Sequence, residues 1–84
     1  MKKLILISIT GVDRPGITAS ITSTLSAYHV NVLDIGQSVI HNSLSLGMLL
    51  EVSSESSIPA LKQAIQKEID DLSLSIRFVQ ITHE

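Results

Sequence analysis

Apolar residues follow a strand-like spacing and a helix-like spacing in turn along this chain, and the order of the two spacings leaves few folds open. Every second residue from Leu44 to Val52 is large and apolar, which is the clearest strand signal. Leu4 to Thr10 is apolar on both faces, as expected of a strand in the centre of a sheet. Val30 to His41 and Leu74 to Thr82 predict two further strands. Apolar residues do not alternate cleanly in the first of these, so we expect a bulge near Gly36.

Two segments show the helical spacing of three and four residues. Gly16 to His29 predicts a helix whose buried side is formed by Ile17, Ile21, Leu25 and Tyr28. The opposite side of this helix is small and uncharged, with Thr18, Ala19, Thr22, Ser23 and Ser26. After a polar loop from Ser53 to Ser57, a second helix is expected to start with Ser57 as its N-cap and Pro59 in its first turn. Its buried side comprises Ile58, Leu61, Ile65, Ile69 and Leu72.

The predicted order is therefore strand, helix, strand, strand, helix, strand, with a hairpin turn formed by His41, Asn42 and Ser43. Two right-handed strand-helix-strand crossovers that share this hairpin give a four-stranded antiparallel sheet with both helices on one face. This α+β arrangement is the ferredoxin-like fold. A chain of 84 residues suffices for one such domain, which we assign to residues 1–84.

Composition excludes several functions that this fold can host. The chain has no cysteine, which excludes thiol chemistry, a disulfide framework and a cysteine-based metal carrier. The net charge is −2 and Leu44 to Val52 has no aromatic residue, which argues against nucleic-acid binding. The apolar run from Leu4 to Ile9 is too short for a signal peptide or a membrane helix. We therefore expect a soluble, cytoplasmic protein with no membrane partner.

The sequence offers no recognisable catalytic residue. His29, His41 and His83 lack metal-binding spacing and are interpreted as surface residues, so neither a metal nor a cofactor is expected. No serine lies in a nucleophile elbow. Arg14 is the one recognisable part of a phosphate cradle, which disfavours acyl-phosphate hydrolysis.

The segment from Gly11 to Ile17 joins the first strand to the first helix and has the composition of a specialised turn. Gly11 and Gly16 permit backbone angles that a Cβ would forbid, and Pro15 suits the first helical position. Asp13 places a carboxylate near the helix start, where free N–H groups could also donate hydrogen bonds to the carboxylate of a small ligand. These residues form either a ligand site or merely a compact turn, and both interpretations stay open at this point.

Three features resemble the ACT domain: the turn from Gly11 to Ile17, the run from Val30 to Ile35, and Gln37. The resemblance covers essentially the whole chain. Leu44 to Val52 is most similar to the amino-terminal ACT domain of bacterial phosphoserine phosphatases. The phosphatase chemistry belongs to a haloacid-dehalogenase-type domain whose Asp-x-Asp motif is absent here. The resemblance therefore implies a regulatory piece that a C-terminal catalytic domain would follow.

ACT domains typically pair and bind a small amino acid between the first strand-helix turn of one copy and the neighbouring copy. The resemblance implies that serine or glycine binds here. The turn amides would hold the ligand carboxylate, and an aspartate would hold the ammonium. The implied pocket is lined by Val12, Asp13, Gly16 and Ile17, with Asn31, Asp34 and Gln37 near its edge.

The distribution of charge independently favours a homodimer. Asp34 is the sole formally charged residue from Pro15 to Leu50, whereas a solvated surface usually mixes many charges. Burial against a partner and solvation by serine and threonine would both explain this. We predict an amino-acid-sensing regulatory ACT domain, serine-binding, of a phosphoserine phosphatase in serine biosynthesis. Two alternatives are a stand-alone ACT-domain regulator that acts on a partner protein, and a purely structural dimerisation module.

Overall fold

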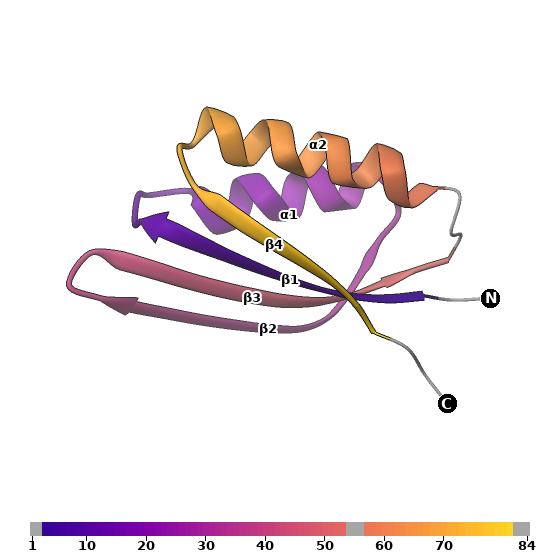
Figure 1. Ribbon diagram of the computed structural model, residues 1–84, viewed down its shortest axis with the longest axis horizontal. Helices are drawn as coiled ribbons and strands as arrows, with labels where there is room; N and C mark the ends of the chain where they lie inside the picture. The colour runs from indigo at the N-terminus through magenta and orange to yellow at the C-terminus, as the bar shows by residue number, and fades with distance from the viewer. Residues whose placement is uncertain (1–2, 54–56, 82–84) are drawn as a thin grey trace.

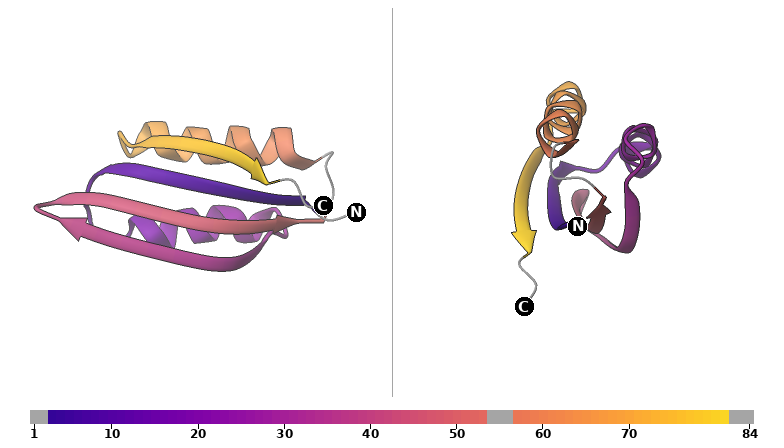
Figure 2. Two further views of the ribbon diagram at one scale, coloured as in Figure 1. Left: turned by 60° about the horizontal axis from the view of Figure 1, so that its bottom comes forward. Right: turned by 90° about the vertical axis from the view of Figure 1, so that its right-hand side faces the viewer.

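The computed structural model describes residues 3–53 and 57–81 and has one antiparallel sheet covered by two helices. The strands lie in the order β2-β3-β1-β4. Both helices cover the same face of the sheet (Figure 1 and Figure 2). The predicted ferredoxin-like fold is therefore confirmed. Its elements are β1 (Lys3–Val12), α1 (Ile17–Ala27), β2 (Asn31–Ile40), β3 (Ser43–Val52), α2 (Ile58–Asp71) and β4 (Ser75–Ile81).

The hydrophobic core lies between the helices and the sheet face that they cover. β1 is central, as its apolar character on both faces predicts, and it pairs with β3 on one side and β4 on the other. No polar or charged side chain among residues 3–53 and 57–81 is buried. The core is aliphatic apart from one methionine, and comprises Ile5, Ile7, Ile9, Ile17, Ile21, Leu25, Leu44, Leu46, Met48, Leu50, Val52, Ile58, Leu61, Ile65, Ile69 and Leu74.

The strand order leaves β2 at an edge of the sheet. All ten residues of β2 are exposed, although half of them are large and apolar. The outer edge of β2 has no neighbouring strand within the described part of the chain, so its backbone N–H and C=O groups can pair with another strand. The exposed apolar residues of β2 are Val32, Leu33, Ile35, Val39 and Ile40.

The bulge in β2 lies at Leu33, so the prediction of a bulge near Gly36 was wrong. The pairing with β3 shifts between Val32 and Asp34, whereas Gly36 pairs regularly with Gly47. The extra residue places Val32 and Ile35 opposite Leu50 and Met48, which are both buried in the core. The bulge therefore turns two apolar side chains of β2 toward the helix side of the sheet.

Both ends of α1 differ from the prediction. The helix begins at Ile17 with Gly16 as its N-cap, so Pro15 precedes the cap and does not occupy the first helical position. Gly16 has a left-handed φ of 85°, and this residue turns the chain into the helix. Tyr28 caps the C-terminus and is 36% exposed, so it does not extend the buried side. His29 follows with a φ of 56°, which directs the chain away from the helix axis.

The remaining turns match the sequence in position but differ in detail. The β2–β3 hairpin has two turn residues, His41 and Asn42, with φ values of 48° and 65°. Positive φ at both positions is typical of a type I′ turn, and Ser43 already belongs to β3. Ser57 is the N-cap of α2, as predicted, but its side chain forms no capping hydrogen bond. Most of the predicted polar loop, and Thr82 of the predicted last strand, lie outside the described residues.

Candidate ligand-binding site

The turn between β1 and α1 follows a path that favours glycine at two positions. Gly11 has a φ of +155°, and a Cβ there would fall on the side chain of Leu74. Gly16 lies in the left-handed region, where L-residues are strained. The Asp13 amide donates a hydrogen bond of 2.8 Å to the carbonyl of Asn42 in the β2–β3 hairpin. The hairpin and the first turn of α1 together fix the turn in place.

A hollow of about 380 Å³ lies over this turn. Gln37, on β2, closes one side, and the Thr18 hydroxyl donates a hydrogen bond of 2.9 Å to its side-chain oxygen. The volume falls within the range of about 300–1,000 Å³ that is typical of small-molecule sites. The hollow is lined by Asp13, Arg14, Pro15, Gly16, Ile17, Thr18, Ala19 and Gln37.

The start of α1 presents backbone donors to the hollow. The first bond of the helix runs from the Ser20 amide to the Gly16 carbonyl, at 2.9 Å. The three preceding amides, those of Ile17, Thr18 and Ala19, have no acceptor inside an α-helix. No side chain caps α1. The helix dipole adds partial positive charge at this end, so the site suits a carboxylate.

The hollow also carries one charged side chain of each sign. Asp13 and Arg14 are both exposed and both line it. A zwitterion could therefore place its carboxylate at the amides and its ammonium at Asp13. Within residues 3–53 and 57–81, no three or more His, Cys, Asp or Glu side chains form a cluster that could hold a metal ion. The chemistry available here is that of binding a small charged or zwitterionic molecule.

The seven predicted site residues fall into two groups in the structure. Asp13, Gly16, Ile17 and Gln37 line the hollow together. The other three do not. Val12 is 61% exposed and lies outside the lining. Asn31 and Asp34 lie nearer the other end of β2, where Asn31 donates a 3.3 Å hydrogen bond to Glu51 and Asp34 borders a separate hollow on the uncovered face of the sheet.

Four lining residues were not predicted as site residues: Arg14 and Pro15 in the turn, and Thr18 and Ala19 after it. Thr18 and Ala19 belong to the first turn of α1, and they were assigned to its small, uncharged side. The signal that could have identified them is their position directly after the Gly16 turn, since the first residues of a helix carry its free amides.

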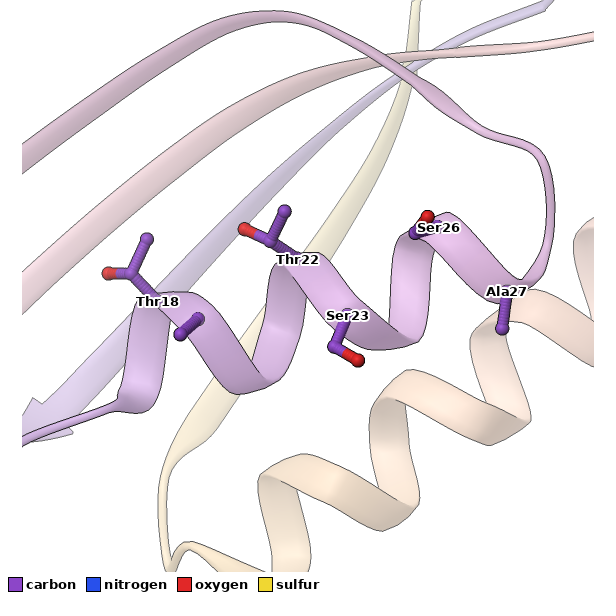
Figure 3. Close-up of a pocket in the computed structure, with 6 residues that line it drawn as sticks. Thr18, Thr22, Ser23, Ser26 and Ala27 are labelled. Carbon is purple, nitrogen blue, oxygen red and sulfur yellow. The ribbon is translucent and has the colours of Figure 1, made fainter.

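The small residues of α1 form a shallow depression beside this site. Thr18, Thr22, Ser23, Ser26 and Ala27 lie along the side of the helix that faces away from the core (Figure 3). The Thr18–Gln37 hydrogen bond joins α1 to β2, and the outer edge of β2 has no neighbouring strand within the described residues. Apart from Asp34 on β2, the margin of the molecule formed by these two elements carries no formal charge. Such a margin fits the burial against a partner that the charge distribution suggests.

Comparison with known proteins identifies relatives of this chain. A family model described as ACT domain matches residues 3–79. The UPF0237 protein of Pyrobaculum aerophilum is 32% identical over 80 residues, which cover 94% of this chain and 89% of that protein. The phosphoserine phosphatase of Streptomyces coelicolor is 48% identical over 46 residues, which cover 55% of this chain and 11% of the enzyme. The likeness to UPF0237 proteins therefore covers nearly all of both chains, and the likeness to the phosphatase covers a small part of the enzyme.

A solved structure shows the same architecture. The ACT domain protein from Streptococcus pneumoniae superposes with a TM-score of 0.80, over 93% of this chain and 89% of that chain. Its sequence is 18% identical, so this likeness concerns the fold alone.

Proposed function

Because the chain belongs to the ACT domain family, we propose that it is a regulatory module that binds a small amino acid and acts on a partner protein. This proposal favours the free-standing regulator over the regulatory piece of a phosphoserine phosphatase. Relatives of similar length support it, because UPF0237 proteins match along nearly their whole length. No helix in residues 3–53 and 57–81 is long and apolar enough to cross a membrane. We place the regulator in the cytoplasm, where free amino acids are made and consumed.

One observation carries the ligand assignment: the uncapped start of α1 opens into the same hollow as a carboxylate and an amide side chain. In the proposed complex, the amides of Ile17 to Ala19 hold the ligand carboxylate, as helix starts hold other anions. Asp13 holds the ammonium group. Gln37 and Thr18 face the ligand side chain, and their hydrogen bond favours a short, polar side chain such as that of serine. Glycine would fit with fewer contacts.

Pairing of two copies through β2 belongs to the same proposal. The exposed apolar residues of β2 and the small residues of α1 would both be buried by a neighbouring copy. In an antiparallel pair, the start of one β2 lies beside the end of the other. Asn31 of a second copy would thereby approach the Gln37 end of β2, and this pairing would bring one more predicted site residue toward the hollow.

The first experiment is calorimetric titration of the purified chain with serine, glycine and phosphoserine, with the oligomeric state followed by sedimentation. We expect saturable binding of serine by a dimer. Thr18→Val should weaken binding, because it removes the hydroxyl that faces Gln37. Thr24→Val is the matched control, because its hydroxyl bonds to the Ser20 carbonyl inside α1 and lies outside the hollow.

Each outcome separates the alternatives. Binding that Thr18→Val weakens and Thr24→Val leaves unchanged supports the turn as the site. A folded dimer that releases no heat with any amino acid would support the structural dimerisation module. Binding to a chain that stays monomeric at high concentration would support a sensor but contradict the pairing.

A further inference from the structure

The face of the sheet away from the helices forms a second surface with an ordered arrangement. Its residues line up in cross-strand rows that run from β2 through β3 and β1 to β4. One row is Ser38, Ser45, Thr10 and Ser75, which are all small and carry hydroxyl groups. The next row is Gly36, Gly47, Ser8 and Arg77. The third is Asp34, Leu49, Leu6 and Val79, and the fourth contains Glu51, Leu4 and Ile81.

The paired glycines create a hollow on this uncovered face. Gly36 and Gly47 are direct neighbours across β2 and β3, and neither adds a side chain to the face. The hollow has a volume of about 220 Å³ and is bordered by Leu6, Leu49 and Asp34, whose side chain carries a carboxylate. A 2.9 Å hydrogen bond from the Ile35 amide fixes one oxygen of that carboxylate. The result is an apolar depression with a negative group at its rim.

The charges on this face are matched but lie too far apart to meet within one chain. Arg77 stands on β4, at the opposite edge of the sheet from Asp34 on β2. Three strand spacings of about 4.8 Å separate those edges by about 14 Å. Arg77 is exposed, and its row ends at the other side in the glycine pair. Arg77 therefore lies at one edge of the sheet, and the hollow beside Asp34 lies at the other edge in the same cross-strand row.

We propose that the uncovered sheet face binds the same face of a second copy, with Arg77 of each copy in the Gly36–Gly47 hollow of the other, beside Asp34. A two-fold axis parallel to the strands brings β4 of one copy over β2 of the other and keeps each row over itself. Arg77 of one copy then lies over Gly36 of the other, next to the cross-strand row that contains Asp34. The same contact occurs twice because the two copies are related by a two-fold axis. The hydroxyl row packs on its equivalent. In the third row, Leu6 of each copy lies over Leu49 of the other, and Val79 lies over Asp34.

The size of the face indicates a weak contact. Four strands about 4.8 Å apart and about eight residues long at about 3.3 Å per residue give roughly 500 Å² of face per copy. Stable specific interfaces bury about 800 Å² per partner. The contact differs from pairing through the β2 edge. It lays the β2 edge of each copy over β4 of the other, so the two contacts together do not close on four copies and would build an open-ended assembly. It also does not involve the turn hollow, so its failure would leave the proposed amino-acid binding untouched.

A charge-exchange experiment tests the contact. Sedimentation velocity over a range of concentrations would compare the native chain, Arg77→Asp, Asp34→Arg, and an equimolar mixture of the two variants. Each variant alone carries like charges at the proposed contact, so we expect its face-to-face association to weaken at least about tenfold. The mixture restores opposite charges between copies, so association should return to nearly the native level.

Two further measurements keep the test independent of folding and of the ligand. Circular dichroism should show native folding for both variants, because both side chains are exposed. Serine titration of Arg77→Asp should match the native chain, since Arg77 does not line the turn hollow. Single variants that associate like the native chain would overturn the proposal, and so would a mixture that stays as dissociated as its components. A native chain that never exceeds a dimer formed through β2 would overturn it as well.

Discussion

Substitutions of Gly16 can show whether this residue serves only the backbone geometry of the turn or also the binding of a ligand. Gly16 has a φ of 85°, and a Cβ added there would meet no heavy atom within 4 Å. Its substitution therefore causes backbone strain without steric overlap. Gly16→Val would not test the site cleanly, because a β-branched residue is costly at positive φ whether or not a ligand binds. Gly16→Ala and Gly16→Asn form a better pair.

The expected loss of stability differs between these two variants. An alanine in the left-handed region costs about 1–2 kcal/mol, and the reduced freedom of the unfolded chain offsets about 0.4–1 kcal/mol of this. We expect Gly16→Ala to lower the free energy of unfolding by roughly 1 kcal/mol. Asparagine tolerates left-handed geometry, so Gly16→Asn should lose about 0.5 kcal/mol or less. The affinity for serine should fall at least about tenfold in both, because both place a side chain in the hollow.

Urea unfolding followed by circular dichroism gives the stability, and calorimetric titration gives the affinity. A change of 1 kcal/mol corresponds to a shift of about 4–8 °C in the melting temperature of a domain this small. Stability should fall more in Gly16→Ala than in Gly16→Asn, whereas the affinity for serine should fall in both. If affinity fell only in the less stable variant, the effect of Gly16 would be structural and the turn would not be the site. If both variants were as stable as the native chain, the left-handed geometry would be wrong.

Four further substitutions test the fold and the exposed surface of β2. Gly11→Ala should lower the melting temperature more than Gly16→Ala in scanning calorimetry, because it adds overlap with Leu74 to the strain; a smaller decrease would contradict the close packing there. His41→Asn should raise the free energy of unfolding by about 0.5 kcal/mol in urea, since asparagine tolerates the φ of 48°, and a loss would argue against the type I′ turn. Ile7→Ala should cost about 2–5 kcal/mol in the same assay, whereas Ile35→Ala should mainly weaken dimerisation; equal costs would place β2 in the core.

The secondary structure and the core could be predicted from the sequence because both depend on local patterns. Strict alternation of apolar residues with other residues predicted the strand from Leu44 to Val52. Apolar residues spaced three and four apart predicted α1 and α2. Each pattern specifies which side of an element is apolar, and an apolar side must be buried somewhere. Hence every buried residue of β3 lies on the predicted face, whereas β1, apolar on both faces, buries only the face with Ile5, Ile7 and Ile9. The special turn was also visible, because glycine and proline carry their backbone preferences with them.

Long-range pairing decided the rest. The sequence alone did not place the bulge at Leu33, because that position depends on which side chains of β3 face β2. It did not place Gln37 beside Thr18, or Asp34 away from the turn on the uncovered face, because those positions follow from the register between strands. The same register aligns Arg77 with the Gly36–Gly47 pair, although 30 residues separate Arg77 from Gly47 in the sequence. Local propensity fixes the elements of this protein, and the hydrogen-bonded sheet determines which of their residues meet.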